Sequence, residues 1–398
     1  MSTIARQAFQ PDPNCALIPQ TVPLQLSGER FRIIYRLGGT EEEARARARD
    51  ICLEQTVEFP DELVPTGPIR DHIIGRLEYF ETRGEGVHQA AISFPVETTG
   101  DDLSQLLNVV MGNISLKPSI RADNLELPPS LLDRFRGPRF GRTGLRELTG
   151  AAQRPLVSTA LKPMGLAPAD LAELAYRFAL GGIDLIKDDH GLTNQTFSRF
   201  EERLARCTEA VAQANRQTGM KSLYLPNVTA SPAEMIRRAR LAKQAGAGGL
   251  LVCPGICGLD AMRAVADDDA TSLPIMAHPA FQGSFVVRPE EGFSHGLLFG
   301  LIARLAGADA TIFPNFGGRF SFSRQQCREI AAAAEAPLGS LRSIFPAPAG
   351  GLTLSRVCEV QQVYGRELVI LVGGGLFKHG PDLIENCRTF RKLAEQFY

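Results

Sequence analysis

The stretch Gly181-Gly182-Ile183-Asp184-Leu185-Ile186-Lys187-Asp188-Asp189-His190 joins an apolar run to a lysine, two acids and a histidine. The apolar run predicts a buried strand whose carboxyl end carries these polar residues. An ammonium group in apolar surroundings is costly, so Lys187 needs a partner or a modification. Two interpretations stay open. Lys187 forms a structural ion pair with Asp188 or Asp189, or Lys187, Asp189 and His190 bind one divalent cation, with Lys187 carrying CO2 as a carbamate.

This run is one of eight similar apolar runs that end in a small, polar or charged residue. They recur about every 25 to 35 residues, with helical patterns between them at 170–180, 232–244 and 324–334. Eight units match the closure of a barrel, and no Gly-x-Gly-x-x-Gly follows the first run, which disfavours a doubly wound sheet. We therefore predict a (β/α)8 TIM barrel over residues 136–398. Its strands are expected at 156–160, 183–187, 222–226, 249–253, 274–278, 310–314, 343–347 and 369–373.

The residues before the barrel have a different pattern. Alternating or strand-like runs and helical runs follow one another without a repeat, at 31–37, 41–53, 87–94 and 102–110. They predict a smaller α+β domain of ferredoxin-like type over residues 1–135. A charged, proline-bearing stretch, 127–142, joins it to the barrel, and two domains suit a chain of 398 residues.

Composition excludes several classes of partner. The chain has 43 basic and 44 acidic residues and a net charge of −1, so we expect no nucleic acid and no membrane surface as partner. No apolar run reaches the roughly 18 residues of a membrane span and the N-terminus lacks an apolar core, which predicts a cytoplasmic protein. The eight cysteines are scattered. Cys253 and Cys257 lack a second ligand pair, which favours reduced thiols over a zinc site.

Other strand ends carry candidate catalytic residues, because function in such barrels lies at the carboxyl ends of the strands. Lys162 follows the first strand, beside the Lys187 cluster. Two neighbouring cations lower an amine pKa, so Lys162 is a candidate for proton transfer, and a salt bridge to Asp189 is the alternative. Asn227 follows the third strand. His278 ends the fifth, a position that favours catalysis over a core histidine.

The loops after the seventh and eighth strands are rich in glycine. In β/α barrels these two loops commonly hold a phosphate, and glycine lets backbone amides approach the anion. Simple turns are the alternative, but two clusters at these two positions favour phosphate binding. The candidates are Gly350 and Gly351 in the first loop and Gly373, Gly374 and Gly375 in the second.

With these residues the chain resembles the large subunit of ribulose-bisphosphate carboxylase, and more closely the RuBisCO-like proteins, the form IV relatives. The resemblance covers nearly the whole chain. Its most specific pieces are 181–189, Asn194-Gln195-Thr196-Phe197-Ser198-Arg199, Leu161-Lys162-Pro163, Met111-Gly112-Asn113 and the glycine loops.

The resemblance implies roles for several residues. Lys187 would be carbamylated and bind Mg2+ with Asp189, and Lys162 would lie near the reacting carbons. The third metal ligand, a glutamate in the carboxylase, is His190 here, which lowers the charge of the site and weakens Mg2+ binding. Glu54 and Asn113 would reach across a homodimer interface into the partner's barrel, with higher assemblies of dimers as the alternative.

Departures from the carboxylase pattern bear on the reaction. Met164 replaces a lysine, Pro279 replaces an arginine that holds a second phosphate, Phe313 lies near the place of a histidine, and Ala349 replaces a serine. The shorter lid at 315–319 offers Arg319 where a lysine would contact CO2. We therefore do not expect carboxylation of a bisphosphate. Asn113 also argues against the enolase branch of the family, in which a lysine on this loop is the base.

We predict an enzyme that forms a metal-stabilised enediolate by carbon-carbon cleavage of a phosphorylated 3-keto sugar acid in carbohydrate catabolism. The cleavage is a decarboxylation or a related hydrolytic step, as in family members that degrade sugar acids. The alternative is isomerisation of a phosphorylated ketose such as 5-methylthioribulose 1-phosphate, with Met164 and Phe313 accommodating the thioether. A non-catalytic scaffold is a third hypothesis. Retention of Lys162, Lys187 and Asp189 disfavours it, because a scaffold has no need of them.

Overall fold

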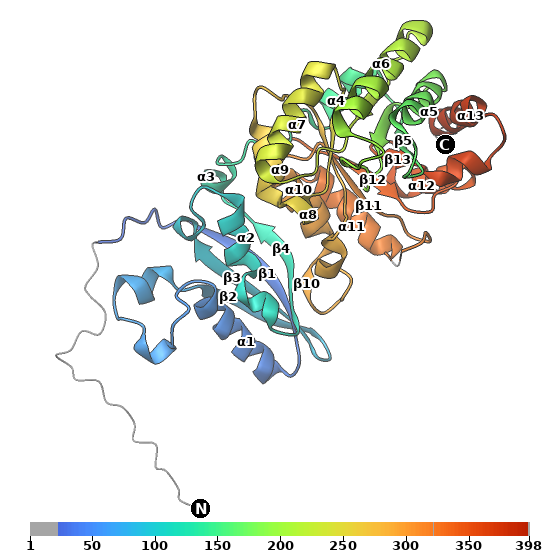
Figure 1. The fold of residues 1–398 in the computed structure, drawn as a ribbon. Coiled ribbons are helices and arrows are strands. Elements are labelled where there is room, and N and C mark those ends of the chain that lie inside the picture. Colours follow the sequence, from blue (N-terminus) through green and yellow to red (C-terminus); the bar gives the residue numbers. More distant parts are fainter. Residues whose placement is uncertain (1–22, 321, 397–398) are drawn as a thin grey trace, which may run out of the picture.

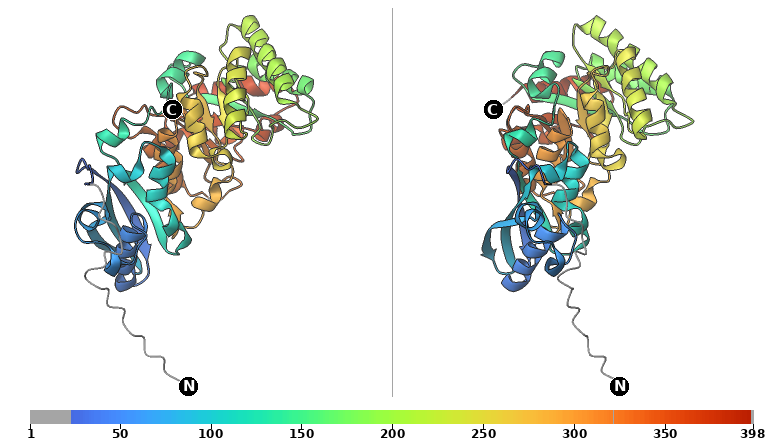
Figure 2. Two further views of the ribbon diagram at one scale, coloured as in Figure 1. Left: turned by 60° about the vertical axis from the view of Figure 1, so that its left-hand side comes forward. Right: turned by 90° about the vertical axis from the view of Figure 1, so that its left-hand side faces the viewer.

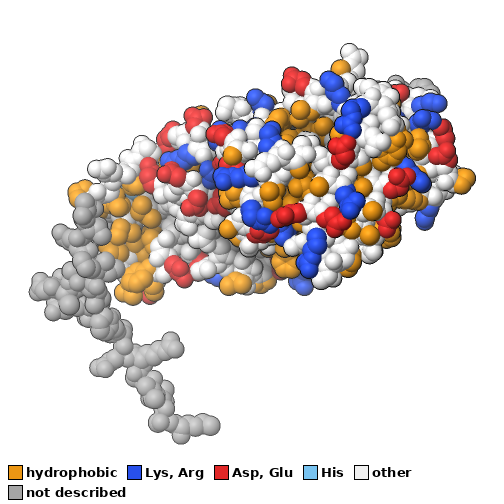
Figure 3. All heavy atoms as spheres, turned by 45° about the horizontal axis from the view of Figure 1, so that its top comes forward, with side chains coloured by type: hydrophobic (Ala, Val, Ile, Leu, Met, Phe, Trp, Pro, Cys, Tyr) orange, Lys and Arg blue, Asp and Glu red, His pale blue; other side chains and the backbone are white. Residues whose placement is uncertain are grey.

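The chain folds into an antiparallel-sheet part and a parallel-strand part that lie one beyond the other along the molecule (Figure 1). The computed structural model describes residues 23–320 and 322–396. Two rotated views in Figure 2 show the same division, with helices wrapped around the parallel strands. Basic and acidic side chains are interspersed over the face shown in Figure 3. Among the described helices, none combines the length and apolarity needed to cross a bilayer.

The N-terminal part is one mixed sheet covered by two helices. Alternate side chains of β1 point to one face and are fully buried, for example Ile33 and Tyr35, and the Tyr35 hydroxyl donates to the carbonyl of Val110 of α2 at 2.7 Å. Helix α1 starts with a capping box of Thr40 and Glu43. The sheet order is β10-β4-β1-β3-β2. The bounds are β1 Arg30–Gly38, α1 Glu41–Glu54, β2 Arg76–Gly84, β3 Val87–Pro95, α2 Leu103–Met111, β4 Ile120–Glu126 and β10 Gly292–Phe293.

The α+β character of this part is confirmed, and its element order is compatible with the ferredoxin-like arrangement, which stays a prediction. One strand of the sheet comes from the other half of the chain. β10 pairs with β4 in parallel, Gly292 opposite Arg121 and Phe293 opposite Ala122. Arg121 also donates hydrogen bonds to the carbonyls of Arg288 and Glu291. The N-terminal sheet therefore includes residues from beyond the predicted boundary at 135.

Eight parallel strands form the other part. They make two four-stranded sheets, β13-β5-β6-β7 and β12-β11-β9-β8. An isolated bridge between Asn227 and Leu251 joins β7 to β8, and β12 lies against β13, so the arrangement is consistent with the predicted closed barrel. The bounds are β5 Leu156–Leu161, β6 Leu185–Asp188, β7 Leu223–Leu225, β8 Leu250–Val252, β9 Ile275–Ala277, β11 Ala310–Pro314, β12 Phe345–Ala349 and β13 Val369–Leu371.

All eight predicted strands are observed, seven of them with shifted ends and β11 with the predicted ones. The seventh was predicted at 343–347 and runs from Phe345 to Ala349. The main helices around the strands are α4 Gly141–Thr149, α5 Pro168–Leu180, α6 Phe200–Thr218, α7 Pro232–Ala245, α9 Leu259–Asp267, η6 Leu297–Ile302, α11 Arg324–Glu335, α12 Val357–Tyr364 and α13 Leu383–Glu395. Short helical turns connect them: η1 Asp61–Leu63, η2 Ile69–Ile73, η3 Val96–Thr99, η4 Asn113–Leu116, α3 Pro129–Leu132, α8 Pro254–Cys257, η5 Gln282–Phe285, α10 Ala303–Leu305, η7 Leu354–Arg356 and η8 Gly374–Lys378.

Side chains alternate between the inside of the ring of strands and the helix layer. Leu185 of β6 belongs to the inner core and Ile186 to the outer one. The inner core also includes Leu156, Leu225, Leu251, Met276, Ala310, Ile312, Phe345, Ala347, Val369 and Leu371. The strands open at their carboxyl ends into a region that we call the mouth. By the same alternation, the residue two positions after the last inner-core residue of a strand faces this mouth. This rule places Lys187 and His278 at the mouth.

A buried acid, Asp309, forms hydrogen bonds at the amino ends of the strands, opposite the mouth. Asp309 is 1% exposed, and its Oδ1 accepts hydrogen bonds from the amides of Phe140 (2.8 Å) and Gly141 (2.6 Å). Its Oδ2 accepts from the amide of Ile275 at 2.8 Å. Because Asp309 binds the start of α4 to β9, we expect it to contribute to stability rather than to catalysis.

We expect Asp309→Asn to lower the free energy of unfolding by about 1–3 kcal/mol, because the NH2 of asparagine would face at least one backbone N–H. Urea denaturation followed by circular dichroism measures this change. Asp133→Asn, at an exposed position, is the control and should change stability by less than about 0.5 kcal/mol. Equal stability of the two variants would contradict the role given to Asp309.

Candidate active site

The ends of β5, β6 and β9 bring five of the predicted residues together. Lys162 Nζ lies 2.8 Å from Asp189 Oδ1, and His190 Nδ1 lies 3.3 Å from the same oxygen. The rings of His190 and His278 are stacked, with centroids 4.3 Å apart. Lys187 lies among them, since its pKa responds to the charges of Asp189 and Lys162. The predicted mouth cluster is therefore observed.

Lys187 is buried and is not held by an acid. Its Nζ donates to the carbonyl of Asp188 at 3.1 Å, and no ion pair to it occurs in the described part of the chain. Burial lowers the pKa of Lys187 to about 8, and the nearby Asp189 only partly opposes this. The ion-pair interpretation of Lys187 is therefore wrong. A neutral amine is accessible near physiological pH, and this is the form that reacts with CO2.

Asp189 is the anion of the cluster. Burial alone would raise the pKa of its carboxyl group, but hydrogen bonds from His190 and Lys162 and the charge of Lys187 outweigh this effect and hold the pKa well below its usual range. The salt bridge to Asp189, which the sequence left open as the alternative for Lys162, is therefore observed. It does not exclude proton transfer, since it holds the Lys162 ammonium at the mouth.

His278 is a neutral hydrogen-bond donor. Burial, together with the charge of Lys187, lowers its pKa to about 2. Its Nδ1 accepts from the amide of Ala280 at 3.1 Å. The ring proton is therefore assigned to Nε2, and His278 can donate to a substrate oxygen from that atom.

The residues fit a divalent cation on one condition. Within residues 23–320 and 322–396, no three His, Cys, Asp or Glu side chains lie close enough together to hold a metal. Asp189 and His190 alone supply two ligands. A carbamate on Lys187 would add oxygen, the donor that Mg2+ prefers. The donor set thus suits a hard cation if Lys187 is modified.

The predicted phosphate residues also lie together. The amide of Arg319, in the loop after β11, donates to the carbonyl of Gly350 at 3.2 Å, and Gly351 packs directly against Arg319. Gly350 and Gly351 have φ of 87° and 93°, which glycine adopts without strain. Gly375 packs against the carbonyl of Leu352, so the loops after β12 and β13 touch.

Two of these glycines border open space. A Cβ atom built on Gly373 or Gly374 would meet no other atom within 4 Å. The two positions are therefore accessible to a ligand, as a phosphate site requires.

Glu54 and Asn113 contact each other but not the mouth cluster of their own chain. Asn113 Nδ2 donates to Glu54 Oε1 at 3.1 Å, and Lys117 lies 3.9 Å from Glu54 Oε2. Both residues belong to the N-terminal part, at the end of α1 and in η4, and Figure 1 shows α1 well away from the parallel strands. If they act at a barrel mouth, it is that of another copy.

Among the residues that differ from the carboxylase pattern, Phe313 was misplaced. It is fully buried on the outer side of β11, where its ring meets that of Tyr364 at 6.1 Å. It therefore cannot accommodate part of a substrate. Met164 remains available, because it is 48% exposed and its methyl group lies over Gly191 beside Asp189.

The sequence interpretation underrated Cys253. Burial raises the pKa of the Cys253 thiol. The thiol also lies close enough to Lys187 for each group to affect the pKa of the other. The signal was present, since Cys253 lies two positions after the inner residue Leu251. It also missed Arg203, whose contacts are described below. The cysteines in the described part of the chain are free, as predicted.

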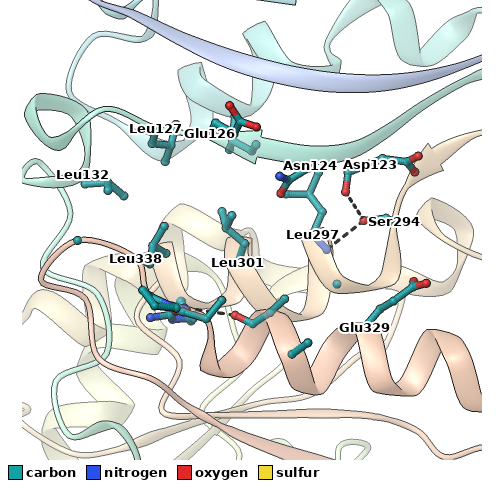
Figure 4. A pocket seen from close by; sticks show the side chains of 18 of the residues that line it. Asp123, Asn124, Glu126, Leu127, Leu132, Ser294, Leu297, Leu301, Glu329 and Leu338 are labelled. Carbon is teal, nitrogen blue, oxygen red and sulfur yellow. Dashed lines mark hydrogen bonds between the residues drawn. The ribbon is translucent and has the colours of Figure 1, made fainter. Parts of the chain in front are cut away.

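A cleft of about 700 Å³ lies elsewhere, between β4 and the helices η6 and α11 (Figure 4). Leucines line one end, and Asp123, Ser294 and Glu329 line the other. Ser294 Oγ donates to the carbonyl of Asp123 at 2.7 Å and accepts from the amide of Leu297. The cleft contains none of the mouth residues, so it is not the candidate active site.

Comparison with known proteins agrees with this geometry. Residues 142–392 match the family described as ribulose bisphosphate carboxylase large chain, catalytic domain. The 5-methylthioribulose-1-phosphate isomerase of Rhodospirillum rubrum is 39% identical over 91% of this chain and 95% of its own length. A 2,3-diketo-5-methylthiopentyl-1-phosphate enolase of Geobacillus thermodenitrificans is 33% identical over 84% of this chain and 79% of its own.

Solved structures give the same result. A Rubisco-like protein from Rhodopseudomonas palustris superposes with a TM-score of 0.85 at 38% identity, covering 92% of this chain and 98% of that one. A dimeric archaeal Rubisco from Hyperthermus butylicus superposes with a TM-score of 0.83 at 27% identity, covering 94% of this chain and 91% of that one. The chain therefore belongs to the ribulose bisphosphate carboxylase large chain family and is one of its RuBisCO-like proteins.

Proposed function

We propose that this RuBisCO-like protein moves a proton on a phosphorylated keto sugar, with isomerisation as the net reaction. The observation that carries the proposal is the Lys162 ammonium, held 2.8 Å from Asp189 at the mouth beside Lys187. A relative 39% identical to this chain is named as an isomerase of a phosphorylated ketose. Carbon-carbon cleavage, which the sequence led us to favour, has no such support and stays a prediction.

Lys187, Asp189 and His190 would hold a divalent cation such as Mg2+, with Lys187 as its carbamate. The cation would supply Lewis-acid polarisation of the substrate carbonyl. Its chemistry suits a site whose protein ligands are mainly oxygen atoms.

The protein's own groups would do the rest. Lys162 would move the proton at the substrate carbon, since Lys187 is committed to its modification and Met164 carries no titratable group. The Nε2–H of His278 would donate to the developing oxyanion. Met164 would contact an apolar part of the substrate, because its methyl group lies over Gly191 at the mouth and the residue is 48% exposed.

The glycine loops would hold the phosphate, and a matched pair of variants tests this. Gly374→Asp should raise KM about tenfold or more, because its carboxylate would repel the anion. Gly374→Asn has the same shape without the charge and should raise KM much less. Steady-state kinetics on a phosphorylated ketose gives both values. Equal KM for the two variants would place the phosphate elsewhere.

One assay separates isomerisation from cleavage. Phosphorylated ketoses and phosphorylated 3-keto sugar acids are incubated with the purified protein and Mg2+ in deuterated water. Mass spectrometry of the products and CO2 detection then follow. Isomerisation predicts an isomer carrying solvent deuterium and no CO2, whereas release of CO2 or of a smaller carbon fragment would establish cleavage.

We also infer that the active unit is a homodimer or a larger assembly, built from an N-terminal domain at 1–135, whose sheet β10 completes, and a barrel at 136–398. Relatives include a dimeric enzyme and an octameric one. The Glu54–Asn113 pair supports this inference, because its contacts leave it without a role in its own barrel. In a homodimer the pair would complete the mouth of the partner.

A further inference from the structure

A buried polar cluster lies directly behind the mouth. Asp188, between Lys187 and Asp189, turns outward into the helix layer and is fully buried. Its Oδ1 accepts from Tyr224 Oη at 2.8 Å, and its Oδ2 accepts from Arg203 Nε at 3.1 Å and from the amide of Asn227 at 3.0 Å. Asp188 therefore anchors the strand end to the helix layer, while the next acid, Asp189, lies with Lys162 and His190 at the mouth.

Arg203, on α6, extends this cluster along the loop between β6 and α6. Its Nη1 donates to the carbonyl of Ser198 at 2.8 Å and to its hydroxyl at 3.1 Å, and its Nη2 donates to the carbonyl of Thr193 at 2.7 Å. Asn227 Nδ2 adds a bond to the carbonyl of His190 at 2.9 Å. The loop is thus held at its beginning, middle and end.

We propose that Arg203 is a positioning residue for the candidate active site. Through Asp188 and the carbonyls of Thr193 and Ser198, it fixes the loop that follows Asp189 and His190, and so fixes the two side chains relative to Lys162. The guanidinium suits this role because its planar fork can serve several acceptors at once, which an ammonium cannot. This inference rests on the proposed function.

Stability alone does not account for the cluster. A buried ion pair is weak evidence for stability, because desolvation of both charges offsets their attraction, and apolar side chains of similar size often stabilise as well. Helix α6 already packs through Leu204, Cys207 and Val211. What apolar residues could not supply is the set of directional bonds to the loop.

A double variant that removes both buried charges separates a role of Arg203 in stability from its role in positioning the loop. Arg203→Met alone leaves Asp188 buried without its cation and should lower the thermal midpoint sharply. Asp188→Asn combined with Arg203→Met removes both charges and should regain much of that midpoint. The loop bonds remain lost, so kcat should stay at least about tenfold below native, the scale seen when outer-shell partners of metal ligands are removed. KM should change less than about twofold, because the phosphate loops lie on other strands.

Metal binding gives a readout that is independent of turnover. Mn2+ binding followed by electron paramagnetic resonance should weaken about tenfold or more in the double variant and in Arg203→Lys. Arg238→Met is the matched control. Arg238 is a buried arginine on the next helix, and it stacks on Phe200 at 5.1 Å, as Arg203 does at 5.9 Å. Among the described residues its hydrogen bonds go to Glu234 and to the carbonyl of Thr229, and none goes to the loop between β6 and α6. It should lower the thermal midpoint and leave kcat and Mn2+ affinity native.

A double variant with native kcat and native Mn2+ affinity would overturn the positioning role. Failure of the native protein to bind Mn2+ would instead refute the metal part of the proposed function. The kcat of the double variant would still decide the role of Arg203 in that case.

Discussion

Lys187→Ala should abolish measurable turnover, a loss on the order of a thousandfold or more, while the protein stays folded. Among the residues that the structure describes, Lys187 makes no ion pair, and its one hydrogen bond goes to the neighbouring backbone carbonyl of Asp188. Its removal would therefore take away the proposed metal ligand rather than a structural contact. Steady-state kinetics with Mg2+, together with circular dichroism, tests this prediction. Lys221→Ala, at an exposed lysine, should retain native activity.

The pH dependence of carbamate formation tests the same residue directly. CO2 reacts with the neutral amine, and the neutral fraction rises as the pH passes the Lys187 pKa of about 8. A carbamate signal in 13C nuclear magnetic resonance, after incubation with labelled bicarbonate, should therefore grow between about pH 7 and pH 9. Lys187→Ala should lack it. Near-native turnover of Lys187→Ala with Mg2+ would contradict the interpretation of Lys187 as a carbamate.

Lys162→Met should lower kcat by a factor on the order of a hundred or more, with a much smaller change in substrate binding. Methionine keeps the length of the side chain but carries no proton, and the phosphate site lies on other strands. Incorporation of solvent deuterium into the product, measured by mass spectrometry, should fall with kcat.

The control for this second variant is Lys221→Met, which should behave as the native protein does. Full rate in Lys162→Met would remove Lys162 as the proton carrier. Because its imidazole is the nearest remaining candidate, His278 would then be the residue to change.

The barrel strands could be predicted because most of their residues are apolar on both sides, as burial between a core and a helix layer favours. β2 could not, since its sequence RLEYFETRG is exposed along nearly its whole length and shows no alternation. β4 could not be predicted either, because it mixes arginine, aspartate and asparagine with apolar residues. A sequence pattern therefore predicts a helix or strand only where one face of the element, or the whole element, is buried.

The candidate site likewise contains residues that the sequence could predict and residues that it could not. Strand ends identified Lys162, Lys187 and His278, because position along a barrel strand carries functional meaning. Phe313 was misplaced although alternation from Ala310 and Ile312 puts it on the outer side. Arg203 could not be singled out, because beside Glu201 and Glu202 it has the composition of a solvated helix face.

The strand β10 gives the chain an assembly order that differs from its order of synthesis. The sheet of the N-terminal part stays incomplete at β4 until residues near Arg288 have been made, 167 positions after Arg121. Until then Arg121 and Ala122 of β4 would lack their partners Gly292 and Phe293, and other chains can pair with such an open strand edge. A fragment ending near residue 135 would keep that edge permanently. Truncation should therefore produce aggregation rather than an independent folded unit.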